Sequence, residues 1–90
     1  MHWRLFATLS EAADTDRVPV EDADTVGEAL DALVATHPDL EAEILDEDGS
    51  LQEHIRLLHD GSDPFRAGEG LSTPVEDGDE LALFPPVSGG

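Results

Sequence analysis

One stretch of the sequence has the apolar spacing of a helix several turns long, and strand patterns stand on both sides of it. Apolar residues recur at helical intervals through residues 26–34, and Thr25 with Glu28 three positions later has the spacing of an N-terminal capping box. Pro38 disfavours helical backbone in the residue before it. The pattern therefore predicts a helix over residues 26–36, with Pro38 opening a second, short helix.

Four other segments have the two-residue alternation of strands with one buried face. They are residues 2–9, 17–21, 54–59 and 80–84. The second segment contains Pro19, which has no N–H to donate to a neighbouring strand, so it is expected at an edge of the sheet. This order of strands around a capped helix predicts an α+β fold, in which one sheet curls over one helix.

The connecting segments are less informative. Residues 10–14 favour a short helix with Ser10 as its cap. Residues 62–73 are rich in Gly and have Phe65 and Leu71 as their apolar anchors. The 90 residues include no Cys, which excludes disulfides and thiolate metal sites, so packing alone must stabilise a domain of this size.

The charge of the chain limits its partners. Asp and Glu number 22 against four Arg and no Lys, for a net charge of −18. Nucleic acids and anionic membranes are polyanions whose binding needs a basic patch, so neither is expected as a partner. Acids scattered along the whole chain favour a halophilic source over a mesophilic protein with one acidic face. No apolar run approaches the ~18 residues of a membrane helix, and the first residues lack the long apolar stretch of a signal peptide, so we expect a cytoplasmic protein.

The end of the chain differs in composition from the rest. Two prolines there favour an extended conformation without internal hydrogen bonds, and two final glycines without Cβ atoms would let a carboxylate enter a narrow activating site. We therefore expect a domain over residues 1–84 and a flexible tail over residues 85–90. The tail residues are Pro85, Pro86, Val87, Ser88, Gly89 and Gly90.

Three parts of the sequence carry a family resemblance. The ending DGDELALFPPVSGG, the LFA at residues 5–7 and the segment TVGEALDALVATHP resemble the ubiquitin-like β-grasp sulfur carriers. That family includes the small subunit of molybdopterin synthase and the small archaeal modifier proteins of halophilic archaea. The resemblance implies a mixed sheet of four to five strands packed on one main helix, with the second strand at the edge and the last strand between the first and the third.

The resemblance also implies a function for Gly90. A separate E1-like enzyme would use ATP and Mg to adenylate the Gly90 carboxylate. The product would then become a thiocarboxylate that donates sulfur, or would form an isopeptide bond to a lysine of a target protein. The chain would be a cosubstrate, monomeric when free, with no bound cofactor and no catalytic machinery of its own.

Two alternative functions stay open at this point. The chain could be the dedicated small subunit of molybdopterin synthase, delivering sulfur together with the large subunit, or a β-grasp binding module with an inert tail. The first alternative uses the same tail and the same docking face as the modifier. The targets, the balance between modification and sulfur transfer, and a contribution to tRNA thiolation are also open.

The implied sheet order predicts a docking patch on the face opposite the helix. Three large apolar side chains would lie on adjacent strands there, rimmed by two of the four arginines. The predicted patch consists of Phe6, Leu58, Phe84, Arg4 and Arg56. A contiguous apolar patch of this kind is typical of a protein contact, although a second small core covered by residues 62–73 would give the same pattern.

Other polar motifs lack the spacing of a known site. No two of the four histidines are spaced i, i+4, and without Cys three of them would have to converge to bind zinc, so no metal site is predicted. Residues 46–53 lack the ligand spacing of a calcium loop. Ser88 has no nearby base in the sequence, so it is given no nucleophilic role.

Overall fold

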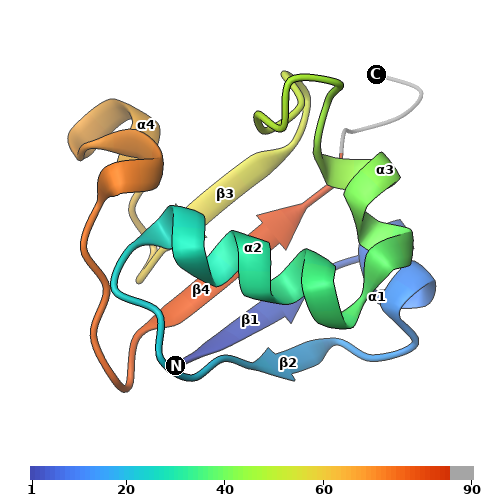
Figure 1. Ribbon diagram of the computed structural model, residues 1–90, viewed down its shortest axis with the longest axis horizontal. Helices are drawn as coiled ribbons and strands as arrows, with labels where there is room; N and C mark the ends of the chain where they lie inside the picture. Colours follow the sequence, from blue (N-terminus) through green and yellow to red (C-terminus); the bar gives the residue numbers. More distant parts are fainter. Residues whose placement is uncertain (86–90) are drawn as a thin grey trace.

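The computed structural model describes residues 1–85, in which a mixed sheet carries helix α2 across one face (Figure 1). The strand order is β2-β1-β4-β3, with β1 parallel to β4 and the other two pairs antiparallel. The strands are β1 (His2–Leu5), β2 (Arg17–Pro19), β3 (Arg56–His59) and β4 (Glu80–Phe84). The α+β fold, the sheet order and the edge position of the strand with Pro19 are confirmed.

Helix α2 (Val26–Thr36) has the predicted bounds and a side-chain cap. Thr25 Oγ1 accepts a hydrogen bond of 3.1 Å from the Glu28 N–H. Glu28 Oε1 in turn accepts from the N–H of Asp24 at 3.0 Å, one residue before the usual partner in a capping box. Both bonds satisfy amide donors at the helix start, which fixes where the helix begins.

The core lies between α2 and the covered face of the sheet. Trp3 of β1 is fully buried, and its indole N–H donates to the Ala29 carbonyl of α2 at 2.9 Å. Leu81 and Leu83 of β4 are also fully buried. No buried side-chain nitrogen or oxygen within residues 1–85 lacks a hydrogen-bond partner, so apolar packing and one satisfied indole join the strands to the helix.

The segment after Pro38 folds as predicted into short helical turns, η1 (Pro38–Leu40) and α3 (Glu41–Ile44). These turns and α1 (Thr8–Ala13) lie near the end of the sheet toward which β1 and β4 run (Figure 1). No helix in the described part of the chain is both long enough and apolar enough to cross a membrane.

The first strand is shorter than its alternation predicts. Strand β1 ends at Leu5, because Ala7 has φ 52° and ψ −127°, which turns the chain out of the sheet. Helix α1 (Thr8–Ala13) follows, so Leu9 reaches the core from a helix and not from a strand. Ser10 is not the helix cap: its hydroxyl lies inside α1 and donates to the Ala7 carbonyl at 2.7 Å.

The third strand and the segment after it also differ from the prediction. Strand β3 begins at Arg56 rather than at residue 54. The weakly patterned residues 62–73 contain α4 (Pro64–Ala67) and the turn η2 (Gly70–Ser72). Asp63 caps α4, because its Oδ1 accepts a 2.8 Å hydrogen bond from the Phe65 N–H.

The distribution of charge predicts strong salt dependence. Within residues 1–85 one arginine–carboxylate pair forms, between Arg66 and Asp63 at 3.9 Å, and the other ion pairs involve histidines. Repulsion among the 22 acids is therefore little offset. Raising KCl from ~0.1 to ~2 M shortens the Debye length several-fold and should raise the melting temperature by roughly 10 °C, the effect of about 2 kcal/mol in a domain of this size.

Thermal melting followed by circular dichroism measures this effect. Sucrose, which stabilises folded proteins by exclusion but screens no charge, supplies the control: in a constant background of sucrose the melting temperature should start higher and should still rise with KCl. A melting temperature that stays flat over the KCl range would contradict the halophilic interpretation.

Candidate functional site

The sheet face opposite α2 carries a stacked aromatic pair. The rings of Phe6 and Phe84 lie parallel within 10°, with 4.4 Å between their centroids. The guanidinium carbon of Arg4 lies 5.5 Å from the centroid of the Phe6 ring, within the range of a cation–π contact. Arg56 stands opposite Phe84 in the antiparallel register of β3 and β4. The register therefore brings four of the five predicted patch residues together.

Leu58 completes the patch through a residue that the prediction omitted. Leu58 is paired with Ala82 across β3 and β4, and Ala82 is paired with Arg4 across β4 and β1. Ala82 is buried, at 9% exposed, but it does not belong to the contiguous core cluster between the sheet and α2. The alternation of residues 80–84 already placed Ala82 on this face. The prediction omitted it because a small side chain does not suggest a contact residue. We call these residues the sheet-face patch: Phe6, Leu58, Ala82 and Phe84, with Arg4 and Arg56.

The sheet-face patch is distinct from the hydrophobic core. Phe6, Leu58 and Phe84 are half-buried, and none of them belongs to the core cluster or packs against it. In residues 62–73, Leu71 packs on the main core and Phe65 is 47% exposed. The interpretation of a second core covered by this segment is therefore wrong, because its two apolar anchors lie elsewhere. Stacking of the two rings explains why they are only partly exposed.

The predicted tail begins beside the sheet-face patch. Phe84 is both a member of the patch and the last residue of β4. Pro85 is half-buried and lines a groove with Thr8, Leu9 and Gln52. The other predicted tail residues lie outside the described part of the chain: Pro86, Val87, Ser88, Gly89 and Gly90.

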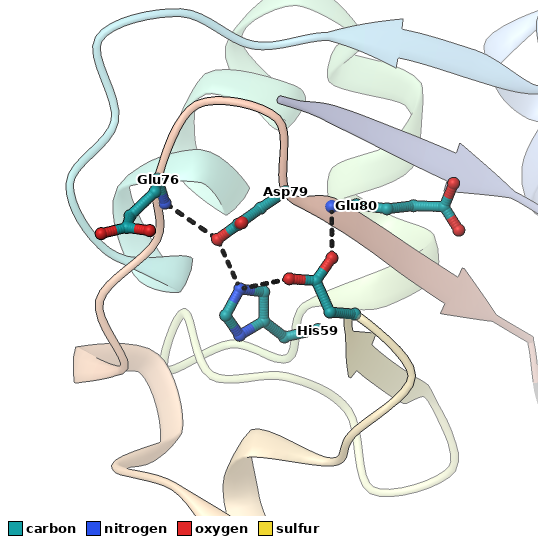
Figure 2. Close-up of polar contacts among 5 residues, drawn as sticks. His59, Glu76, Asp79 and Glu80 are labelled. Carbon is teal, nitrogen blue, oxygen red and sulfur yellow. Dashed lines mark hydrogen bonds and ion pairs between the residues drawn. The ribbon is translucent and has the colours of Figure 1, made fainter.

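A second polar cluster, which the sequence did not indicate, joins β3 to the start of β4 (Figure 2). His59 Nε2 lies 2.7 Å from Asp79 Oδ2 and 3.7 Å from Asp60 Oδ2. Both carboxylates are held by backbone, since Asp79 accepts from the Glu76 N–H and Asp60 from the Glu80 N–H, each at 2.8 Å. Only the fold brings together His59 and Asp79, which are 20 residues apart.

The donor atoms of this cluster lie within 4.8 Å of one another, a spacing that could hold a metal ion. The contact between His59 and Asp79 already uses one donor of each residue, however, and it explains the cluster as a structural cross-link. The hydrogen bond from His59 and then that from the Glu76 N–H hold the pKa of Asp79 below its ordinary value of 3.8.

This lowered pKa predicts a pH-dependent contribution to stability. The ionised Asp79 stabilises the fold above its unfolded pKa, and the contribution is lost as the pH falls through the lower folded pKa. Asp79→Asn should therefore lower the free energy of unfolding at neutral pH, and its difference from wild type should shrink below ~pH 4. Urea unfolding at a series of pH values, at constant salt, measures both.

Asp77→Asn is the matched control, since Asp77 is exposed in the same turn and its loss removes the same charge. The free energy of unfolding of Asp77→Asn should not fall below that of wild type at neutral pH. A deficit of Asp79→Asn that stays constant from neutral pH to pH ~2 would contradict the assignment.

Comparison with known proteins gives the same family as the sequence resemblance. The ThiS family model matches residues 3–90. The chain is 50% identical to small archaeal modifier protein 1 of Haloferax volcanii over the full length of both chains. The crystal structure of SAMP1 from Haloferax volcanii aligns with a TM-score of 0.85 at 49% identity, covering 100% of this chain and 98% of the other.

A further match is a chain in the crystal structure of the Amycolatopsis orientalis BexX/CysO complex. It has a TM-score of 0.84 and 27% identity, and the alignment covers 99% of this chain and 98% of that one. The mixed sheet, the capped helix and the sequence matches agree over nearly the whole length. The chain therefore belongs to the ThiS family of ubiquitin-like β-grasp sulfur carriers, to which its similarity to the small archaeal modifier proteins also assigns it.

Proposed function

We propose that the chain is a ubiquitin-like modifier and sulfur carrier that is activated at the Gly90 carboxylate. An E1-like enzyme, using ATP and Mg, joins this carboxylate to AMP and releases pyrophosphate. A sulfide nucleophile or the unprotonated amine of a target lysine then attacks the carbonyl carbon, the bond from that carbon to the AMP oxygen breaks, and AMP leaves. The products are a thiocarboxylate for sulfur transfer or an isopeptide bond to the target. The chain acts in the cytoplasm as a cosubstrate and supplies no catalytic group.

The observation that carries this proposal is that the sheet-face patch lies where the tail leaves strand β4. Phe84 belongs to the patch, and Gly90 follows it by six residues, which extend to at most ~20 Å. An enzyme that docks on the patch is thereby within reach of the terminal carboxylate. Arg4 and Arg56 at the rim supply positive charge on an otherwise acidic chain, which fits a partner with carboxylates at its contact surface.

Expression of an N-terminally tagged chain in its host tests the proposal. A modifier should give a ladder of tagged conjugates that disappears when Gly90 is deleted. If deleting Gly90 from the host's own copy abolishes molybdoenzyme activity while the tagged chain gives no ladder, the chain is instead a dedicated small subunit of molybdopterin synthase, working with the large subunit. Neither effect would be seen for a binding module with an inert tail.

The absence of lysine makes a further prediction about the conjugates. A modifier forms polymers when a side-chain amine of one copy attacks the activated C-terminus of another copy. Arg cannot act as this nucleophile, because its guanidinium group stays protonated. The α-amino group of Met1 is the one amine in this sequence. We therefore expect single attachments, so that several bands on one target reflect several lysines of that target.

Mass spectrometry can decide this with an untagged Ser88→Arg variant, in which the Met1 amine stays free and from which trypsin leaves a Gly-Gly remnant on each acceptor amine. Ladders equal to those of wild type would show that the variant is conjugated normally. Remnants should then occur on target lysines. A Gly-Gly remnant on Met1 in the bulk of the conjugates would show linear chains and contradict the prediction.

A further inference from the structure

Charge is distributed unevenly between the sheet and the rest of the chain. The four strands contain three of the four arginines but one of the 22 acids. That acid is Glu80, whose Oε2 lies 3.2 Å from His2 Nε2. The three arginines are exposed, and the strand register places them on the face opposite α2: Arg4, Arg17 and Arg56. The strand residues of this face therefore carry an excess of positive charge, although the whole chain has a charge of −18.

Two of these arginines stand directly opposite each other. Arg4 of β1 is the register partner of Arg17 of β2, and the two strands lie side by side (Figure 1). Like charges at opposite positions of a sheet lower its stability. Neither arginine forms an ion pair within residues 1–85, although the chain has 22 acids. The fold thus retains an unfavourable contact that a carboxylate from another molecule would neutralise. We call Arg4 and Arg17 the arginine pair.

The contacts of the arginine pair leave most of its donors available. The Arg4 guanidinium lies over the Phe6 ring, and a stacked guanidinium keeps its in-plane N–H donors. A terminal nitrogen of Arg17 lies 3.4 Å from His2 Nε2. The same ring nitrogen is 3.2 Å from Glu80 Oε2, and it can either accept from Arg17 or donate to Glu80, but not both. His2 therefore supplies at most one acceptor to the pair.

We propose that the arginine pair binds carboxylates on the surface of the activating enzyme, so that the docking surface continues from the sheet-face patch onto β2. This inference rests on the proposed function and names the chemistry of the partner's surface. Guanidinium groups bind carboxylates through two parallel N–H···O bonds. Arg4 belongs to the sheet-face patch and to the pair, so the two surfaces are continuous. Because the rest of the chain is acidic and repels an acidic surface, the pair would also determine which face turns toward the enzyme.

Charge reversal at Arg17 tests this proposal, because binding and stability should respond differently. Arg17→Glu should bind the enzyme about tenfold more weakly or worse, since it replaces a charge-assisted hydrogen bond by repulsion. Arg66→Glu is the matched control: Arg66 is exposed on α4, beside β3 at the other edge of the sheet, and its reversal changes the net charge equally. It should bind like wild type. Isothermal titration calorimetry at one KCl concentration measures both affinities.

Thermal melting shows whether Arg17 acts on binding or on the fold. Arg17→Glu places a carboxylate opposite Arg4, and opposite charges at paired positions stabilise a sheet. Its melting temperature should therefore be no lower than that of Arg66→Glu.

Arg17→Lys gives a second test that does not depend on how well Arg17→Glu folds. The wild-type chain has no lysine, so this variant has a single side-chain amine. A carbodiimide joins an amine to a carboxylate that is in contact with it. The complex with the enzyme is treated without ATP, and linked peptides are identified by mass spectrometry. Position 17 should be linked to an Asp or Glu of the enzyme, whereas position 66 of an Arg66→Lys variant should not.

Pyrophosphate exchange with the wild-type chain separates this inference from the proposed function. If wild type supports exchange but Arg17→Glu binds no worse than Arg66→Glu, the arginine pair takes no part in docking, and activation at Gly90 stands. The inference alone is also overturned if position 17 gives no link to the enzyme, or is linked to a second copy of this chain instead. If the wild-type chain neither binds the enzyme nor supports exchange, the inference and the proposed function both fail.

Discussion

Deleting Gly90, or adding one residue after it, is expected to abolish ATP-dependent adenylation by the cognate E1-like enzyme. Removing one residue moves the carboxylate by up to ~3.5 Å, and a misplacement of even ~1 Å at a reacting centre can cost about a hundredfold in rate. Exchange of labelled pyrophosphate into ATP measures the adenylation directly. Activity with either variant should fall to the level seen without the protein.

Two controls separate the carboxylate from the fold and from the rest of the tail. Melting temperature and circular dichroism should not change in the Gly90 variants, since the described core of residues 1–85 does not depend on this residue. Ser88→Ala should keep full exchange activity, because no nucleophilic role is assigned to Ser88. Pyrophosphate exchange that persists with the truncated chain would refute activation at Gly90.

The elements that could be predicted from the sequence are those with a local physical cause. Helix α2 begins at its Thr25 cap and ends before Pro38, and both signals lie within a few residues of the boundary. The edge position of β2 follows from Pro19, whose missing N–H is a property of one residue. At these positions the local preference of the sequence agrees with the tertiary structure, which is why the sequence pattern predicted both elements correctly.

The errors arise where tertiary structure overrides the local pattern. Alternation continues past Leu5, but the positive φ of Ala7 ends the strand, and Leu9 keeps its buried position by entering a helix. Burial at a given residue does not reveal from which element its side chain comes. Helix α4 is four residues long, and its signal was limited to Asp63 followed by Pro64, a cap and a first helical residue.

The site was predictable as a set of side chains but not as a surface. Alternation assigned Phe6, Leu58 and Phe84 to one face, whereas their adjacency came from the strand order that the family resemblance implied. The inclusion of Ala82 depends on the register of three strands, and the contact of His59 with Asp79 depends on the pairing of β3 with β4. Register is a long-range property, so a single sequence carries little information on it.

The sheet-face patch makes the second large prediction. Leu58→Asp should weaken binding to the activating enzyme by roughly thirtyfold or more, because an unpaired charge in a desolvated contact costs at least ~2 kcal/mol. Phe6→Asp should act in the same direction, since it also breaks the stack with Phe84. Isothermal titration calorimetry with the enzyme measures the loss. Ala35→Asp, which adds the same charge on an exposed position of α2, should bind like wild type.

Adjacent leucines on opposite faces of β3 separate docking from stability. Leu57 is 1% exposed and belongs to the core, so Leu57→Asp should unfold the chain. Leu58 is half-buried and outside the core, so Leu58→Asp should melt within a few degrees of wild type while it loses binding. If Leu58→Asp instead unfolds like Leu57→Asp, the residue stabilises the fold and the docking assignment fails. If it folds and binds with wild-type affinity, the activating enzyme approaches the tail from another face.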